Sequence, residues 1–149
     1  MKGKKHINSP YKYYFKDLGL RNARLNFRQF EKNHLMENLI YNELRIRGYN
    51  VDVGVVPAVI RDNEGKQQRS NYEIDFICNA GSKRYYIQSV YRMDNDDKIK
   101  QEKSSLLKVD DSFKKIIIVG DEMPVTRDDN GITIINIYDF LLKSNSLEL

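Results

Sequence analysis

Three polar residues of this 149-residue chain have types and positions that could build a hydrolytic site. Glu37 lies at the edge of the apolar face of a predicted helix, Asp75 interrupts an apolar strand, and Gln88 lies inside the next strand. Glu73 precedes Asp75 by two residues, so both carboxylates share one face of a strand. Carboxylates around a hard cation, with a lysine that orients water, commonly hydrolyse phosphodiesters. The sequence predicts Glu37 and Asp75 as catalytic residues and Mg²⁺ ligands, with Gln88 as a neutral third member.

A purely structural interpretation of the same residues stays open. Asp75 could be a hydrogen-bonded structural carboxylate, because an isolated buried charge is costly. Glu37 could point into solvent from the border of its helix. Gln88 is better suited to a structural role, since an amide is no general base. Glu43 and Arg47, four residues apart on the same helix, are predicted to form an ion pair.

The elements that must position these residues follow from the hydrophobic pattern. A helix is predicted over 34–47, with Asn33 as N-cap and Gly48 as its end. Its apolar face is centred on Leu35, Leu39 and Ile46 and is extended by Met36, Ile40 and Leu44. Strands are predicted at 51–56, 72–78, 83–91, 114–119 and 132–137. Two further helices are predicted at 94–108 and 138–143, a short helical piece at 20–25, a strand-like segment at 11–15 and a loop at 61–70.

The predicted order of the main elements is α-β-β-β-α-β-β-α. The turn at 79–82, which contains Asn79 and Gly81, joins the second and third strands as a hairpin. The helix at 94–108 has the length of a crossover to a parallel strand at 114–119. The expected fold class is α/β, with a mixed sheet flanked by helices.

Three motifs resemble those of the PD-(D/E)XK nuclease-like, or restriction-endonuclease-like, fold. They are ENL at 37–39 on a helix, EIDFI at 73–77 on one strand and YIQSV at 86–90 on the next. More specifically, the chain is similar to the nuclease-like C-terminal domain of a prokaryotic (archaeal-type) AAA+ ATPase family. The blocks that carry this resemblance are KYYFKDLGLRNA at 12–23, HLMENLI at 34–40 and ELRIRGY at 43–49. It extends over nearly the whole chain, to about residue 142.

The resemblance also implies what is altered or absent. Active nucleases of this fold carry an acidic residue, one spacer and a lysine on the third strand, where this chain has Gln88, Ser89 and Val90. Loss of one oxyanion-stabilising donor costs on the order of 10²–10³ in rate. The site is therefore expected to be degenerate, unless Lys83 or Arg92 replaces the lysine. No phosphate-binding G-x-x-x-x-G-K-[ST] loop is present, so the ATPase core itself is missing and the chain is expected to be a fragment or a stand-alone form of the domain.

Charge divides the chain into two parts. Residues 1–28 carry eight basic residues against Asp17 alone, a net charge of +7, which leaves −3 for the remainder. The basic part is interleaved with tyrosines, a composition that suits phosphate contacts and base stacking. The predicted nucleic-acid contacts are Lys2, Lys4, Lys5, Lys12 and Lys16. A solvated surface with inward-facing tyrosines is the alternative.

Composition excludes several classes of protein. The longest aliphatic run covers only 116–119, far below the roughly 20 residues that cross a bilayer. A single cysteine, Cys78, forms no internal disulfide and is predicted to be a small buried apolar residue. His6 and His34 lack acidic neighbours that would favour a metal site. No apolar stretch follows the basic N-terminus as a secretory signal would require, so a cytoplasmic location is expected.

Three functions fit these observations. The first is a degenerate nuclease-like module, residues 31–149 behind a basic segment 1–30, that binds nucleic acid or regulates an associated AAA+ ATPase. The second is an active Mg²⁺-dependent endonuclease. The third is a pure protein-interaction domain, in which the basic segment belongs to an interface.

Overall fold

The computed structural model describes residues 12–28, 30–61, 67–92 and 96–149. Its centre is a six-stranded mixed sheet in the order β1-β2-β3-β4-β6-β5. The strands are β1 (Asn50–Arg61), β2 (Gln67–Ala80), β3 (Lys83–Val90), β4 (Lys114–Val119), β5 (Thr126–Arg127) and β6 (Thr133–Asn136). The helices are α1 (Leu18–Arg24), α2 (Lys32–Ile46), α3 (Asp96–Leu107) and α4 (Ile137–Leu142), followed by a 3-10 helix, η2 (Ser146–Glu148).

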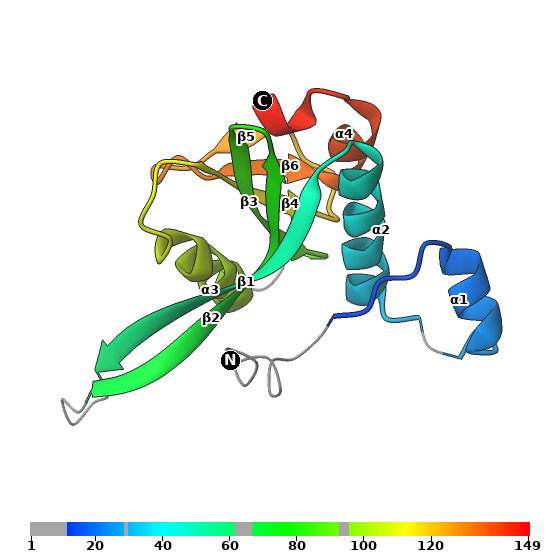
Figure 1. Ribbon diagram of the computed structural model, residues 1–149, viewed down its shortest axis with the longest axis horizontal. Coiled ribbons are helices and arrows are strands. Elements are labelled where there is room, and N and C mark those ends of the chain that lie inside the picture. The colour runs from blue at the N-terminus through cyan, green and yellow to red at the C-terminus, as the bar shows by residue number, and fades with distance from the viewer. Residues whose placement is uncertain (1–11, 29, 62–66, 93–95) are drawn as a thin grey trace, which may run out of the picture.

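Strand directions confirm the predicted mixed α/β class. β1, β2 and β3 form an antiparallel meander, β3 pairs with β4 and β4 with β6 in parallel, and β5 returns antiparallel to β6. The helix α3 makes the crossover from β3 to β4. Figure 1 shows the long β1–β2 hairpin reaching beyond the rest of the sheet, and α1 standing apart from the sheet on the side of α2.

Helices cover both faces of the sheet, and each face has its own apolar core. On one face α2 and α4 cover a cluster that includes Ile40, Phe76 and Ile118. On the other, α3 contributes Leu106 to a cluster with Ile74 and Ile117. β4 supplies alternate residues to both clusters, which explains why its sequence is a continuous aliphatic run.

The structure corrects several boundaries. The helix α2 begins at Lys32 with Glu31 at the N-cap, so Asn33 lies inside the helix. Its buried face contains Met36, Ile40 and Leu44, whereas Ile46 is 79% exposed, because the sheet lies beneath the first three residues and not beneath the last. Gly48 takes a positive φ of 86° just after the helix, as expected of a glycine that ends one.

Extended pairing reaches further than the sequence indicated. The predicted loop at 61–70 contains the start of β2, since residues 67–70 pair with 58–61 of β1; residues 62–66 lie outside the described residues. The predicted strand at 11–15 is absent at 12–15, where the backbone bonds to a side chain of α2 and not to a strand. The short helical piece predicted at 20–25 is confirmed as α1, whereas β5 and η2 were not predicted.

Candidate functional site

The candidate site lies where β2 separates from β3. Cα pairing between these strands runs from Ala80–Lys83 to Phe76–Ile87 and ends there. In the pairing of β2 with β1, Ile74 lies opposite Gly54 and Ile77 lies opposite Asp52. β2 therefore has one residue more than β1 between these two pairs. Asp75 and Phe76 thus lie opposite the single residue Val53 as a β-bulge, and a bulge bends the strand and redirects its side chains.

Side chains replace the missing ladder bonds at this split. The Asp75 amide N–H donates to Gln88 Oε1 at 2.7 Å, and Gln88 Nε2 donates to the Glu73 carbonyl at 3.0 Å. The Ser89 amide N–H donates to Asp75 Oδ2 at 2.9 Å. Gln88 Nε2 also donates to Glu102 Oε2 of α3 at 2.8 Å, and Gln88 is only 1% exposed. Gln88 thus has a clear structural task in joining β2, β3 and α3.

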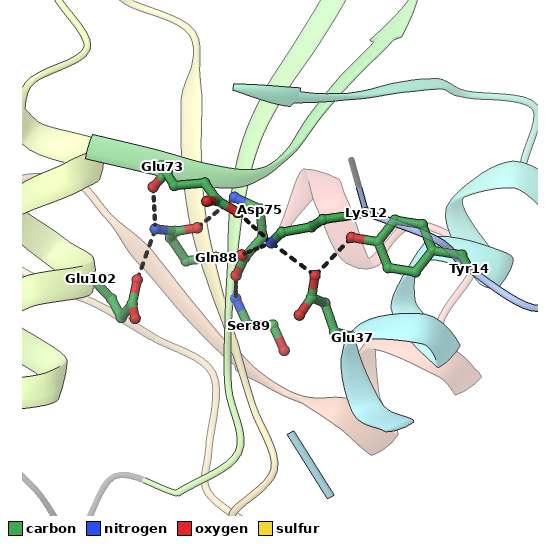
Figure 2. Close-up of polar contacts among 8 residues, drawn as sticks. All are labelled: Lys12, Tyr14, Glu37, Glu73, Asp75, Gln88, Ser89 and Glu102. Carbon is green, nitrogen blue, oxygen red and sulfur yellow. Dashed lines mark hydrogen bonds and ion pairs between the residues drawn. The ribbon is translucent and has the colours of Figure 1, made fainter. Parts of the chain in front are cut away.

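Lys12 brings a positive charge into the same site. Its Nζ lies 2.9 Å from Glu37 Oε1, 2.6 Å from Glu73 Oε1 and 2.8 Å from Asp75 Oδ1. Figure 2 shows these contacts converging on Nζ, with Glu37 entering from α2 and the other two carboxylates from β2. An ammonium group has three protons to donate, so these carboxylates use its full capacity.

The charges of the site shift the pKa values of Lys12 and Asp75. Burial by itself lowers the pKa of Lys12. The Asp75 charge and the hydrogen bonds to the three carboxylates raise it by more than burial lowers it, so the pKa lies above its ordinary value. Burial raises the pKa of Asp75, and Lys12 together with the Ser89 N–H offsets only part of that rise. Three carboxyl groups therefore share one ammonium group.

The segment 12–16, which we call the strap, is fastened to α2 along its length. The Tyr14 hydroxyl donates to Glu37 Oε1 at 2.7 Å, and its ring stacks on Tyr41 with centroids 4.2 Å apart. Burial and the Glu37 contact raise the pKa of Tyr14, which keeps the phenol protonated. Asn38 accepts from the Phe15 amide at 2.8 Å and donates to the Phe15 carbonyl at 2.7 Å. The strap thus holds Lys12 in place through contacts that Tyr14 and Phe15 make with α2.

Two hollows flank the Lys12 contacts. One, of about 280 Å³, lies toward α1 and α2 and is lined by Lys12, Tyr13, Arg21, His34 and Glu37 among others. The second, of about 360 Å³, lies toward α3 and is lined by Glu73, Asp75, Gln88, Gln101, Glu102 and Ser105 among others. The carboxylates are therefore reached from both sides of Lys12.

The structure brings Glu37, Asp75 and Gln88 together, as expected from the sequence. Glu73 belongs to the same cluster. Sequence reasoning missed Lys12 as the centre of the cluster, because nothing in the local pattern shows that residue 12 returns to a strand 63 residues later. Lys83 does not replace the missing lysine, since its Nζ lies 2.6 Å from Glu148. The predicted Glu43–Arg47 ion pair is present at 2.8 Å, and Cys78 is buried.

Of the predicted phosphate contacts, Lys16 is exposed, and Lys2, Lys4 and Lys5 lie outside the described residues. A phosphate contact by Lys12 would require its ammonium to leave the three carboxylates. The expectation that His34 lacks an acidic neighbour is wrong, because His34 pairs with Glu31, one turn earlier, at 2.8 Å. His6 lies outside the described residues. The nucleic-acid contacts stay predictions.

The carboxylates are suitable ligands for Mg²⁺ in type but not in arrangement. Oxygen ligands suit a hard cation, yet the Lys12 ammonium stands between all three. Among the described residues, no group of three or more His, Cys, Asp or Glu side chains is placed to hold a metal ion. The site as built therefore does not fit a metal.

Comparisons with known proteins give relatives but no established activity. The chain is 30% identical over 143 residues to an uncharacterized protein of Haemophilus influenzae, a match to 96% of this chain and 32% of the relative. It is 33% identical over 109 residues to an uncharacterized protein of Methanocaldococcus jannaschii, 70% of this chain and 22% of the relative. The chain therefore spans about a third or less of the length of these relatives. No family model matches it.

Within the described residues, no helix is long and apolar enough to cross a membrane.

Proposed function

We propose that this chain is a degenerate nuclease-like module that binds nucleic acid without cleaving it. In this proposal its sheet and flanking helices are a restriction-endonuclease-like, PD-(D/E)XK core of order α-β-β-β-α-β-β-α. The positions of Glu37 on α2, Asp75 at the β2 bulge and Gln88 on β3 support that assignment. The nucleic-acid role rests on the basic, tyrosine-rich segment of residues 1–28.

The Lys12 ammonium is the observation that carries the proposal of inactivity. It donates to Glu37, Glu73 and Asp75 and so supplies the neutralising charge that a divalent cation would supply. An ammonium has no open coordination position with which to polarise a phosphoryl oxygen or lower the pKa of bound water. The Gln88 amide is held by three hydrogen bonds and takes no proton. The site therefore stabilises the fold and lacks the groups for hydrolysis.

Regulation of an associated AAA+ ATPase is the second candidate, and an apolar groove supports it. The groove of about 470 Å³ lies between α1, α2 and α4 and is lined by Leu18, Leu35, Leu39, Tyr138 and Leu141 among others. The two relatives are much longer than the region they share with this chain, which leaves room in them for a further domain. In this candidate the groove receives the ATPase.

One assay separates these functions. The purified chain is titrated into fluorescently labelled single-stranded and double-stranded DNA, with Mg²⁺, with Mn²⁺ or with EDTA, and both binding and cleavage are followed. We expect binding that is the same with Mg²⁺ and with EDTA, and no cleavage, because no metal takes part. Asp75→Ala should leave this result unchanged, and Asp129→Ala, on the exposed turn before β6, is the matched control.

Divalent-dependent cleavage that disappears in Asp75→Ala and persists in Asp129→Ala would overturn the proposal in favour of an active endonuclease. Absence of DNA binding at low salt would favour the protein-interaction function.

A further inference from the structure

The helix α1 is held away from the apolar cores. None of its seven residues, all within the described part of the chain, is buried, and Leu20 is 70% exposed. The helix is nevertheless well formed, since Asp17 caps it by accepting from the Leu20 amide at 2.9 Å. Figure 1 shows it standing out from the body of the molecule. Leu18, Arg21 and Asn22 are only half-buried, so most of the surface of this capped helix is open to a partner.

Aromatic rings are exposed beside this helix. Phe27 is 61% exposed and Phe30 is 56% exposed, and their rings stack with centroids 6.4 Å apart and planes 20° apart. Asn26 and Phe27 have positive φ values of 49° and 54°, a conformation that is uncommon for residues other than glycine. This turn holds the Phe27 ring in solvent and not in the core. Tyr13, 83% exposed, lines the 280 Å³ hollow together with Arg21 of α1.

The segment that carries Phe27 and Phe30 is basic. Residues 16–32 carry five basic and two acidic side chains, a net charge of +3. Both acidic side chains are already engaged, Asp17 in the helix cap and Glu31 with His34. Arg24 and Arg28 are exposed on either side of the turn. The surface therefore combines stacking platforms with a positive potential.

That combination suits one class of ligand. Single-stranded nucleic acid binds to surfaces on which bases stack on aromatic rings while basic residues follow the phosphates. The centre of a protein interface, in contrast, is depleted of charged residues. We propose that Phe27, Phe30 and Tyr13 are stacking platforms for single-stranded nucleic acid, with Arg24 and Arg28 as its phosphate contacts. This inference rests on the proposed nucleic-acid role and assigns it to the α1 surface, separate from the carboxylate site.

The test measures binding of the full chain to fluorescein-labelled dT and rU oligonucleotides of about 20 nucleotides by anisotropy, at several salt concentrations. The double variant Phe27→Ala/Phe30→Ala should lose about 10-fold or more in affinity without a change in salt dependence. Arg24→Ala/Arg28→Ala should reduce the slope of log K against log salt by about 1.4, at about 0.7 for each phosphate contact on a single strand.

Matched controls lie on other parts of the surface. Phe113→Ala removes an exposed aromatic ring between α3 and β4, and Lys108→Ala removes an exposed charge after α3. Both should bind as the wild type does. Circular dichroism of every variant confirms that the fold is retained, which is expected because the substituted side chains are exposed.

The outcomes separate this inference from the proposed function. If the wild type binds and the α1 variants bind equally well, the α1 assignment is wrong while the nucleic-acid role stands. If the wild type does not bind at about 50 mM salt, both are wrong. If the Phe27/Phe30 variant changes self-association in light scattering and leaves oligonucleotide binding unchanged, the surface is a protein interface and the inference is overturned.

Discussion

Lys12 balances three carboxylates that come from two elements, Glu37 from α2 and Glu73 and Asp75 from β2. Each carboxylate is at least partly withdrawn from water, with side-chain exposures of 16%, 47% and 18%. Removing the cation leaves the carboxylates close together, partly withdrawn from water and without a counter-charge. The resulting loss of stability is larger than the net stabilisation that the intact contact provides. Lys12 therefore stabilises the fold by compensating the charge of the candidate site.

Lys12→Met should destabilise the chain by about 1–3 kcal/mol, because the aliphatic stem remains while the charge is lost. Urea unfolding followed by circular dichroism measures the change. Lys16→Met, on the same strap but exposed, is the matched control and should lie within about 0.5 kcal/mol of the wild type. Equal stability of the two variants would show that Lys12 contributes nothing beyond its stem.

The stability lost in Lys12→Met should depend on pH. Burial raises the folded-state pKa of Asp75 above its ordinary 3.8, and without Lys12 the main opposing charge is gone. A carboxyl whose folded pKa is raised stabilises the fold fully below the unfolded pKa, and this stability is lost as pH rises through the folded pKa. The deficit of Lys12→Met relative to the wild type should thus be larger at pH 8 than at pH 5. A deficit that grows on acidification would contradict this account.

The strap is an irregular element that replaces sheet pairing with side-chain contacts. Asn38 is 4% exposed and uses its amide for both the N–H and the C=O of Phe15, much as a neighbouring strand would. Asn42 adds bonds to the Phe15 and Lys16 carbonyls. The strap is therefore ordered by α2, and α2 in turn positions Lys12 for the carboxylates of β2.

Asn38→Ala should loosen the strap more than Asn42→Ala does. The first variant leaves the Phe15 amide without its acceptor, whereas the second removes only donors to carbonyls at a more exposed position. Hydrogen exchange should show lost protection at the Phe15 amide in Asn38→Ala alone, with a stability cost of about 1–2 kcal/mol. Full protection of that amide in Asn38→Ala would show that Lys12 and Tyr14 hold the strap by themselves.

At the scale of the whole molecule, helices cover both faces of the sheet where the two apolar cores lie, so reagents reach these cores only when the helices separate from the sheet. Cys78 lies near the C-terminal end of β2, has no exposed surface and belongs to the α2–α4 cluster. Burial, with a smaller contribution from Asp52, raises the pKa of the Cys78 thiol to about 12. The thiol is therefore neutral and shielded in the folded chain.

Cys78 should react with a disulfide reagent at pH 8 only through unfolding. The reaction rate should rise in Lys12→Met by about 5-fold for each kcal/mol of lost stability, because the population of the open form rises by that factor. Lys16→Met serves again as the control and should react at the wild-type rate. Rapid reaction of the folded wild type would contradict the buried position of Cys78.

The local sequence pattern was sufficient to predict the elements whose residues favour a single local structure. The aliphatic run of β4 was predicted at its observed bounds, because a short β-branched run is typical of a strand buried on both faces. The β2–β3 hairpin followed from its turn residues, and Gly81 has the positive φ of 58° that such a turn needs. The Glu43–Arg47 pair followed from helical spacing alone.

Only the tertiary structure decided how the candidate site is arranged. The bulge at Asp75 depends on the register of β2 against two neighbours at once, and a one-residue shift moves every side chain to the other face. Lys12 meets Asp75 across 63 residues of sequence, through contacts with α2 that no local pattern encodes. The sequence by itself determined which charges the chain carries and which elements bear them. Their meeting at one point required pairing and packing between distant segments, because electrostatic contacts depend on distance in space and not along the chain.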